Sequence, residues 1–276
     1  TGDQAKDANL IGQFGVGFYS AFMVADQVTV LTRRADAAPD EAIRWKSEAD
    51  GNYTLEDITK DTRGTDVILH LKEEEKAYLK EWELRKVVKQ YSDFIEYPVV
   101  MEVTRNQPDP DDKEKSVEKT ESETLNSRKA IWIKDKSEVS EEEYNEFYKH
   151  VSNDFNDPAR TIHYRAEGTT EFSVLLYLPK ERPFDIHYQD YKIGPTLYVR
   201  RVQIMDHCEA MLPPYLRFVK GVVESADLPL NVSREMLQDN KVVNVIKKNI
   251  TKKVLDTLAA MKKDDLEAYT AFYDQF

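Results

Sequence analysis

Residues 11–34, IGQFGVGFYSAFMVADQVTVLTRR, pass from a glycine cluster to a short apolar segment and then to a strand pattern. The chain has only 9 glycines in 276 residues, yet Gly12, Gly15 and Gly17 lie close together in this stretch. The apolar residues that follow have the i, i+3, i+4, i+7 spacing of a short buried helix, namely Phe18, Ala21, Phe22 and Ala25. A glycine cluster in a glycine-poor chain indicates a backbone shaped for a ligand.

The order of the glycines, GxxGxG, excludes two common phosphate-binding motifs. A dinucleotide fingerprint needs GxGxxG directly after a strand, and a P-loop needs Gly-Lys-Ser/Thr, whereas Gly17 is followed by Phe18 and Tyr19. Backbone amides freed by glycine and the positive end of a following helix still favour an anion such as phosphate. A tight turn for helix packing explains the same residues, so both interpretations stay open at this point.

Composition indicates a globular chain of about two domains. Hydrophobic residues make up 41% and charged residues 33%, with a net charge of -12 that disfavours nucleic acid as a partner. No apolar run approaches the roughly 20 residues that a membrane span needs. The single cysteine, Cys208, excludes an internal disulfide and fits a reducing compartment such as the cytoplasm. We expect it to be a buried small hydrophobe, with a reactive thiol as the alternative.

In the first half of the chain, several patterns predict strands and a helix. Asp50-Gly51 lies between two alternating arms and predicts a hairpin, and the stretches 64–71 and 97–103 predict further strands. Residues 75–95 have helical spacing. Residues 106–127 are rich in charge and poor in aliphatic side chains, so we expect a charged linker there, between domains 1–105 and 128–276.

The second half carries stronger helix signals. Ser140 and Glu143 form a capping-box pattern. EFSVLLYLP (171–179) and PTLYVRRVQIM (195–205) predict strands, and residues 240–261 predict a long amphipathic helix, followed by another helix from near Asp264.

Several segments, in order, resemble the heat-shock protein 90 chaperone family. They are the glycine stretch, RGT (63–65), YSDFIEYPV (91–99), EEEYNEFYKHVSNDFNDP (141–158), LYVRRVQIMD (197–206) and LRFVKGVVESADLPLNVSREMLQ (216–238). The short linker resembles the bacterial or organellar branch. The resemblance implies an incomplete α/β (α+β, two-layer) split-nucleotide-pocket ATPase sandwich, then an α/β/α middle-domain sandwich and the start of a helical segment.

The resemblance also implies roles for particular residues. The loop closing over the ATP phosphates is matched by Gln13, Phe14, Gly15, Val16, Gly17 and Phe18. Thr65 matches a threonine that helps hold adenine through water, although it could simply start a strand. Arg234 matches an arginine that reaches the γ-phosphate, with Asn231 and Gln238 lining the same loop. A cation in the first turn of a helix opposes the helix dipole, so Arg234 calls for an anionic partner. A surface ion pair with Glu235 or Glu224 is the alternative.

The family's partners are implied in the same way. Trp132 and the stretch Phe184, Ile186 and Tyr188 resemble exposed sites for unfolded client proteins, although burial is the commoner fate of a tryptophan. The resemblance further implies ATP/ADP and Mg²⁺, co-chaperones such as the 70-kDa chaperone system, a role in the stress response, and a homodimer. Because the chain starts TGDQAKDANL, we expect a fragment. The magnesium ligand and the dimerising C-terminal domain would then lie outside it. Alone, it would hydrolyse no ATP above background.

Two other classes of function compete with a chaperone. A pure interaction module would use the acidic surface to bind basic or unfolded partners, with a merely structural glycine loop. Another split-pocket ATPase, such as a topoisomerase subunit, would need basic surfaces for DNA, which the net charge of -12 opposes.

Overall fold

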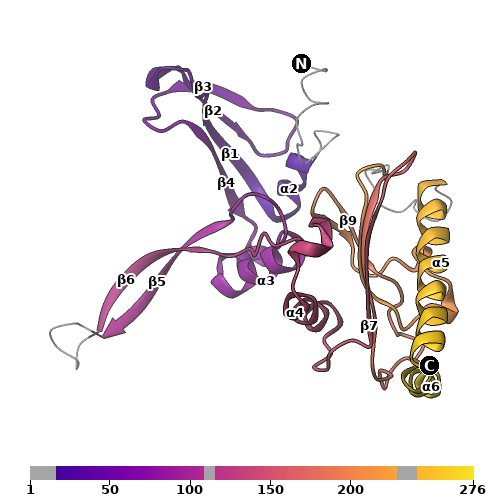
Figure 1. Cartoon of the computed structure of the whole chain (residues 1–276). Coiled ribbons are helices and arrows are strands. Elements are labelled where there is room, and N and C mark those ends of the chain that lie inside the picture. The colour runs from indigo at the N-terminus through magenta and orange to yellow at the C-terminus, as the bar shows by residue number, and fades with distance from the viewer. Residues whose placement is uncertain (1–16, 109–115, 229–240) are drawn as a thin grey trace. The chain divides into compact units, whose positions relative to one another are not determined.

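The computed structural model describes residues 17–108, 116–228 and 241–276 of the chain (Figure 1). Two compact units divide within a helix, the first ending at Lys86 and the second beginning at Val87. Both contain sheets and helices, which confirms the mixed α/β class.

The first unit is built around a four-stranded antiparallel sheet with the order β3-β2-β1-β4. Its strands are β1 (Ala25–Arg33), β2 (Ala42–Ser47), β3 (Thr54–Ile58) and β4 (Gly64–Leu71). The predicted hairpin is confirmed, since β2 pairs with β3 across the Asp50-Gly51 turn. Gly51 has a φ of +87°, and the Asn52 backbone N–H donates to the Asp50 carboxylate at 2.9 Å.

Two helix predictions in the first unit are only partly right. The short helix is a 3₁₀ turn, η1 (Gly17–Ser20), followed by α2 (Ala21–Val24). No residue of these two elements is buried, and Phe18 of the predicted apolar face is 38% exposed, whereas Ala25 at the start of β1 is buried as expected. The helix predicted over 75–95 is split into η3 (Glu73–Leu79) and α3 (Glu81–Tyr91), because Lys80 between them is extended. The helix ends early because Phe94 joins a buried aromatic cluster and is only 5% exposed.

Strands occupy most of the segment that composition predicted as a charged linker. Strands β5 (Val100–Pro108) and β6 (Ser116–Thr124) form an antiparallel hairpin. Polar cross-strand pairs stabilise it, such as the hydroxyls of Thr104 and Thr120 at 3.0 Å. The composition typical of a linker therefore belongs here to a two-stranded ribbon, because such a ribbon pairs its backbone while burying few side chains, Val103 being one that is buried.

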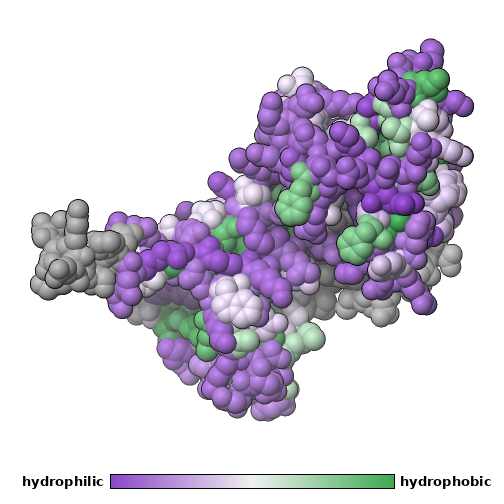
Figure 2. All heavy atoms as spheres, turned by 90° about the horizontal axis from the view of Figure 1, so that it is seen from below, coloured by the Kyte–Doolittle hydropathy of each residue, from purple (hydrophilic) through white to green (hydrophobic). Residues whose placement is uncertain are grey.

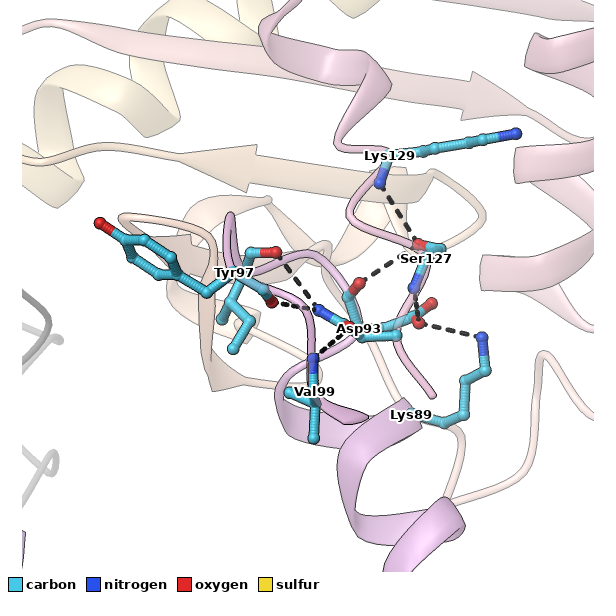
Figure 3. A network of polar contacts seen from close by, with 8 residues as sticks. Lys89, Asp93, Tyr97, Val99, Ser127 and Lys129 are labelled. Atoms are coloured by element: carbon cyan, nitrogen blue, oxygen red, sulfur yellow. Dashed lines mark hydrogen bonds and ion pairs between the residues drawn. The ribbon is translucent and has the colours of Figure 1, made fainter. Parts of the chain in front are cut away.

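The base of this hairpin is fixed by two buried polar residues (Figure 3). The Asp93 carboxylate accepts hydrogen bonds from Lys89 Nζ at 3.0 Å and from the Ser127 backbone N–H at 2.8 Å. The Asn126 amide accepts from the Val99 N–H and donates to the carbonyls of Ile95 and Tyr97. Because buried polar groups are costly when unpaired, this network holds the two arms of the hairpin in register.

The second unit is a three-layer sandwich. Its mixed sheet has the order β10-β9-β11-β8-β7 and runs between helix α4 on one side and helices α5 and α6 on the other (Figure 1). The strands are β7 (Arg160–Ala166), β8 (Phe172–Leu178), β9 (Thr196–Val199), β10 (Val202–Met205) and β11 (Lys220–Glu224). The helices are α4 (Glu141–Ser152), α5 (Lys241–Asp264) and α6 (Leu266–Gln275). This layering agrees with the sandwich that the resemblance implied.

Strand β8 explains the three layers, because all of its residues are buried. Successive side chains of a strand point to opposite faces. Val174 and Leu176 therefore pack in the cluster that contains the apolar side of α5, whereas Leu175 and Tyr177 pack in the aromatic cluster beside α4. The continuous apolar run predicts a strand covered on both faces, and the structure confirms it.

The face of the molecule seen in Figure 2 is mostly hydrophilic, with scattered apolar side chains. In the ranges that the structure describes, no helix is both long and apolar enough to span a bilayer.

Candidate functional site

Only the last two residues of the predicted phosphate loop lie within the described residues. Gly17 opens η1, where Ser20 Oγ donates to its carbonyl, and Phe18 follows it. The other loop residues, Gln13, Phe14, Gly15 and Val16, lie outside the described ranges. A Cβ at Gly17 would meet no heavy atom within 4 Å, so packing among the described residues does not require glycine there.

Phe18 lies at the apolar face of the first unit's sheet. Its ring packs edge-on against Trp45 at 5.5 Å, and Trp45 stacks on Tyr53 at 6.3 Å. By register, Trp45 shares this face with Val67. Val67 is 51% exposed, so the first unit presents an apolar wall next to the glycine turn.

Thr65 lies near the start of β4, opposite Thr32 of β1. Their hydroxyl oxygens are 2.8 Å apart, and both residues are close to solvent. Gly64 before it has a φ of +112°, which suits glycine at a strand start. The hydroxyl is thus accessible and already makes one hydrogen bond, which is compatible with both interpretations of Thr65.

The three predicted catalytic residues, Asn231, Arg234 and Gln238, lie outside the described residues. The elements on both sides of them are described: β11 with Ser225 to Leu228 before, and α5 after. Ser225 is 2% exposed, its N–H donates to the Tyr198 carbonyl at 3.2 Å, and its hydroxyl donates to the Glu171 carbonyl at 2.6 Å. The segment therefore leaves the sheet from a firmly held position.

The prediction that Trp132 is exposed is wrong. Trp132 is 1% exposed, and its ring packs against Phe94 at 4.8 Å and Tyr198 at 4.9 Å. Its indole N–H donates to the Glu224 carboxylate. The core aromatics come from distant parts of the chain, and together they bury the indole and supply the partner that its N–H needs.

Phe184 behaves as expected for an exposed aromatic. It is 87% exposed, with Tyr188 at 6.2 Å between ring centroids, whereas Ile186 of the same stretch is buried at 3%. The sequence analysis missed Phe155, which is 95% exposed. A signal was present, because Phe155 lies in the polar loop SNDFNDP directly after a helix end at Asn153, whose φ is +56°.

Cys208 is buried, as predicted, and burial raises the pKa of its thiol to about 11. A thiol with that pKa is inert near neutral pH, so Cys208 is a packing residue. Within the described ranges, no group of three or more His, Cys, Asp or Glu side chains could hold a metal ion.

The strained turn between β9 and β10 is a further feature of the second unit. Arg200 and Arg201 have φ values of +49° and +63°. Non-glycine residues in this region cost roughly 1–2 kcal/mol each. Such strain persists only where the surroundings impose it, and it concentrates at functional positions.

The described residues define the class of the protein. One unit is built on an open antiparallel sheet that follows a glycine-rich stretch of sequence, and the other is a three-layer sandwich with exposed aromatic side chains. A family model described as "Hsp90 protein" matches residues 101–276, more than half of the chain. The chain belongs to the Hsp90 family.

Bacterial relatives match over nearly the whole chain. Proteins named "Chaperone protein HtpG" from Geobacter sulfurreducens and Geobacter metallireducens are each 56% identical over 278 residues. The protein of that name from Vibrio campbellii is 52% identical over 274 residues. Each alignment covers 99% of this chain and 43% of the relative, so the chain spans less than half the length of these relatives.

Proposed function

We propose that this chain is part of an ATP-dependent molecular chaperone. The observation that carries the proposal is the identity of 50% or more, over 99% of the chain, to proteins named as chaperones. Within the full-length protein, binding and hydrolysis of ATP would change the exposure of surfaces that contact partly folded clients. The family also suggests Mg²⁺ with the nucleotide, a homodimer, co-chaperones and a cytoplasmic location.

The nucleotide would be held at the glycine loop. Residues 13–18 would donate backbone N–H groups to the phosphates, and Thr65 would contact adenine through its hydroxyl. Among the described residues no heavy atom lies within 4 Å of a Cβ placed at Gly17, which supports this role, because a phosphate can approach a backbone that lacks a Cβ. The apolar wall formed by Trp45 and Val67 would exclude water from the side of the site where the adenine base binds.

Arg234 would supply positive charge from the second unit. Its guanidinium stays protonated and donates several hydrogen bonds in one plane, which suits the oxygens of a transferred phosphoryl group. Asn231 and Gln238 would line the same loop and orient it.

Clients would bind to exposed aromatic side chains of the second unit. Phe184, Tyr188 and Phe155 are the candidates, since each is more than half exposed. Large aromatic side chains in contact with solvent gain most when a partner's apolar surface covers them.

The test is steady-state ATP hydrolysis by the full-length protein. Arg234→Ala should lower kcat about 100-fold or more with little change in nucleotide affinity, because the lost contact acts mainly in the transition state. Arg165→Ala is the control, since Arg165 is a surface residue that pairs with Glu167 and Glu171. A full-length protein that hydrolysed no ATP, or in which both variants retained full turnover, would overturn the proposal.

A further inference from the structure

A groove of about 440 Å³ lies beside the exposed aromatic side chains of the second unit. It is lined by residues of the loop after β8, of the turn before β11 and of the end of α6. The loop after β8 contributes Ile186 and His187 to the lining. In sequence these two residues lie between Phe184 and Tyr188, which are the exposed aromatics. The groove therefore adjoins the surface that we propose for clients.

The inner part of the groove is apolar. Ile186 and Phe218 are buried, and the ring of Phe218 packs against that of Phe276 at 4.7 Å. Tyr215, which also lines the groove, is 64% exposed. An apolar side chain of a partner that lay in the groove would cover these rings, and it would gain free energy because apolar surface leaves the water.

Two arginines, Arg182 and Arg217, supply positive charge to the same groove. The Arg217 guanidinium is held in place, since its Nε donates to the Pro214 carbonyl at 3.1 Å and its Nη1 to the Ile186 carbonyl at 3.3 Å. Its Nη2 has no hydrogen-bond partner among the described residues. In the same ranges, neither guanidinium forms an ion pair. The groove thus offers guanidinium N–H groups that a partner's acceptor can use.

The charge of this groove is opposite to that of the chain as a whole. No Asp or Glu is among the described residues that line the groove, although Asp185 belongs to the same loop. The chain carries a net charge of -12, so most of its surface repels an acidic partner. Arginine binds carboxylates through charge-assisted hydrogen bonds, which are about twice as strong as neutral ones. The lining is therefore complementary to an apolar group that lies next to a carboxylate.

From this lining we propose that the groove binds client segments in which an acidic side chain lies next to an apolar one. The apolar side chain would cover Tyr215 and Phe218, and the carboxylate would accept hydrogen bonds from Arg182 and Arg217. The inference rests on the proposed function, because it names the class of client segment that one of the proposed client surfaces selects.

The test is the binding of two short peptides to the full-length protein, measured by fluorescence anisotropy. The acidic probe carries glutamate on both sides of a leucine-phenylalanine pair, and the neutral probe has glutamine in place of each glutamate. Both are acetylated and amidated, so that the only carboxylates are those of side chains. The acidic probe should bind about tenfold more tightly, because its carboxylates meet the two arginines. The difference should shrink at high salt, which screens charge.

The variants assign this preference to the groove. Arg182→Gln should remove most of it, because the variant loses one of the two cations and keeps the backbone N–H that donates to Gln275 at 3.3 Å. Lys180→Gln is the matched control, since it removes the same charge from an exposed residue that does not line the groove, and it should keep the preference. Phe184→Ala should weaken the binding of both probes to a similar extent, because this ring contributes apolar contact area alone.

The outcomes separate the groove from the proposed function. Equal affinities of the unaltered protein for the two probes would overturn the inference. An equal loss of preference in Arg182→Gln and Lys180→Gln would also overturn it, because positive charge anywhere on this loop would then suffice. If Phe184→Ala weakens the binding of both probes while Arg182→Gln changes neither, the aromatic client surface stands and the selection of acidic segments is wrong. If none of the three variants changes the binding of either probe, both the groove and the Phe184 surface are wrong, while turnover in Arg234→Ala still decides the ATP-dependent function.

Discussion

At the scale of single residues, His163 shows how burial fixes a protonation state. It is 6% exposed on β7, and its Nε2 lies 3.2 Å from the Trp132 carbonyl. A carbonyl only accepts, so Nε2 carries the hydrogen, and Nδ1 accepts from the Tyr144 hydroxyl at 2.6 Å. The neutral ring satisfies both partners. Burial consequently lowers the pKa of His163, opposed in part by the hydrogen bond to Trp132 and by Asp135, while Lys136 adds to the lowering.

The lowered pKa of His163 predicts a loss of stability in mild acid. The unfolded chain takes up the proton first, at a pKa of about 6.5, so the stabilising effect is complete above that pH and is lost as the pH falls toward the folded pKa. His163→Gln, whose amide can also donate to Trp132 and accept from Tyr144, removes the titration. Urea unfolding should show the unaltered chain losing stability relative to this variant between pH 7.5 and 5. The loss should be about 1.4 kcal/mol for each unit by which the pKa is lowered. His207 is present in both proteins, so its contribution to the pH dependence cancels in the comparison. If the free energies of unfolding of the two proteins changed in parallel with pH, the prediction would be contradicted.

At the scale of elements, Gly221 lets β11 lie between β8 and β9. Its φ is +130°, and a Cβ there would lie 2.1 Å from the Leu175 carbonyl oxygen. Gly221→Ala should therefore lower the free energy of unfolding by more than about 3 kcal/mol, since backbone must move in the central sheet. Gly168→Ala is the control, because Gly168 has a φ of +154° and a Cβ there would meet no described heavy atom within 4 Å, and it should cost about 1 kcal/mol. If urea unfolding showed equal losses for both variants, the positive φ of the glycine, and not its close approach to the Leu175 carbonyl, would decide the effect.

Elements set by neighbouring residues are the ones that the sequence predicts best. The capping box is an example, since Ser140 Oγ accepts the Glu143 N–H and the Glu143 carboxylate accepts the Ser140 N–H. The exposure of Trp132 could not be predicted, because its burial depends on Phe94 and Tyr198, which are distant in sequence. The pairing of β5 with β6 was missed for another reason. Because the cross-strand pairs are polar, the sequence of these strands does not show the alternation of apolar and polar residues that predicts a strand. The predicted catalytic residues stay predictions.

At the scale of the whole molecule, the two units differ in how much apolar surface they bury. The second unit contains two large buried clusters, centred on β8. In the first unit the buried apolar residues among those described are small, namely Ala25, Val28, Ala37 and Ala42. Larger ones such as Leu55 and Tyr53 are more than half exposed. Because burial of apolar surface is the main stabilising term, the burial seen among the described residues leads us to expect that the first unit is the less stable one.

This difference predicts two separate unfolding transitions for the chain. Amide hydrogen exchange at increasing urea should show β1 to β4 losing protection first, while β8 and β11 stay protected until a second, higher midpoint. A chain that starts at Lys80, and so keeps α3 whole, should retain the higher midpoint unchanged, because both large clusters lie after that residue. As an internal check, Gly221→Ala should lower only the second midpoint. A single transition at which all strands lost protection together would show that the two units unfold as one, and that the exposed apolar face of the first sheet does not weaken it.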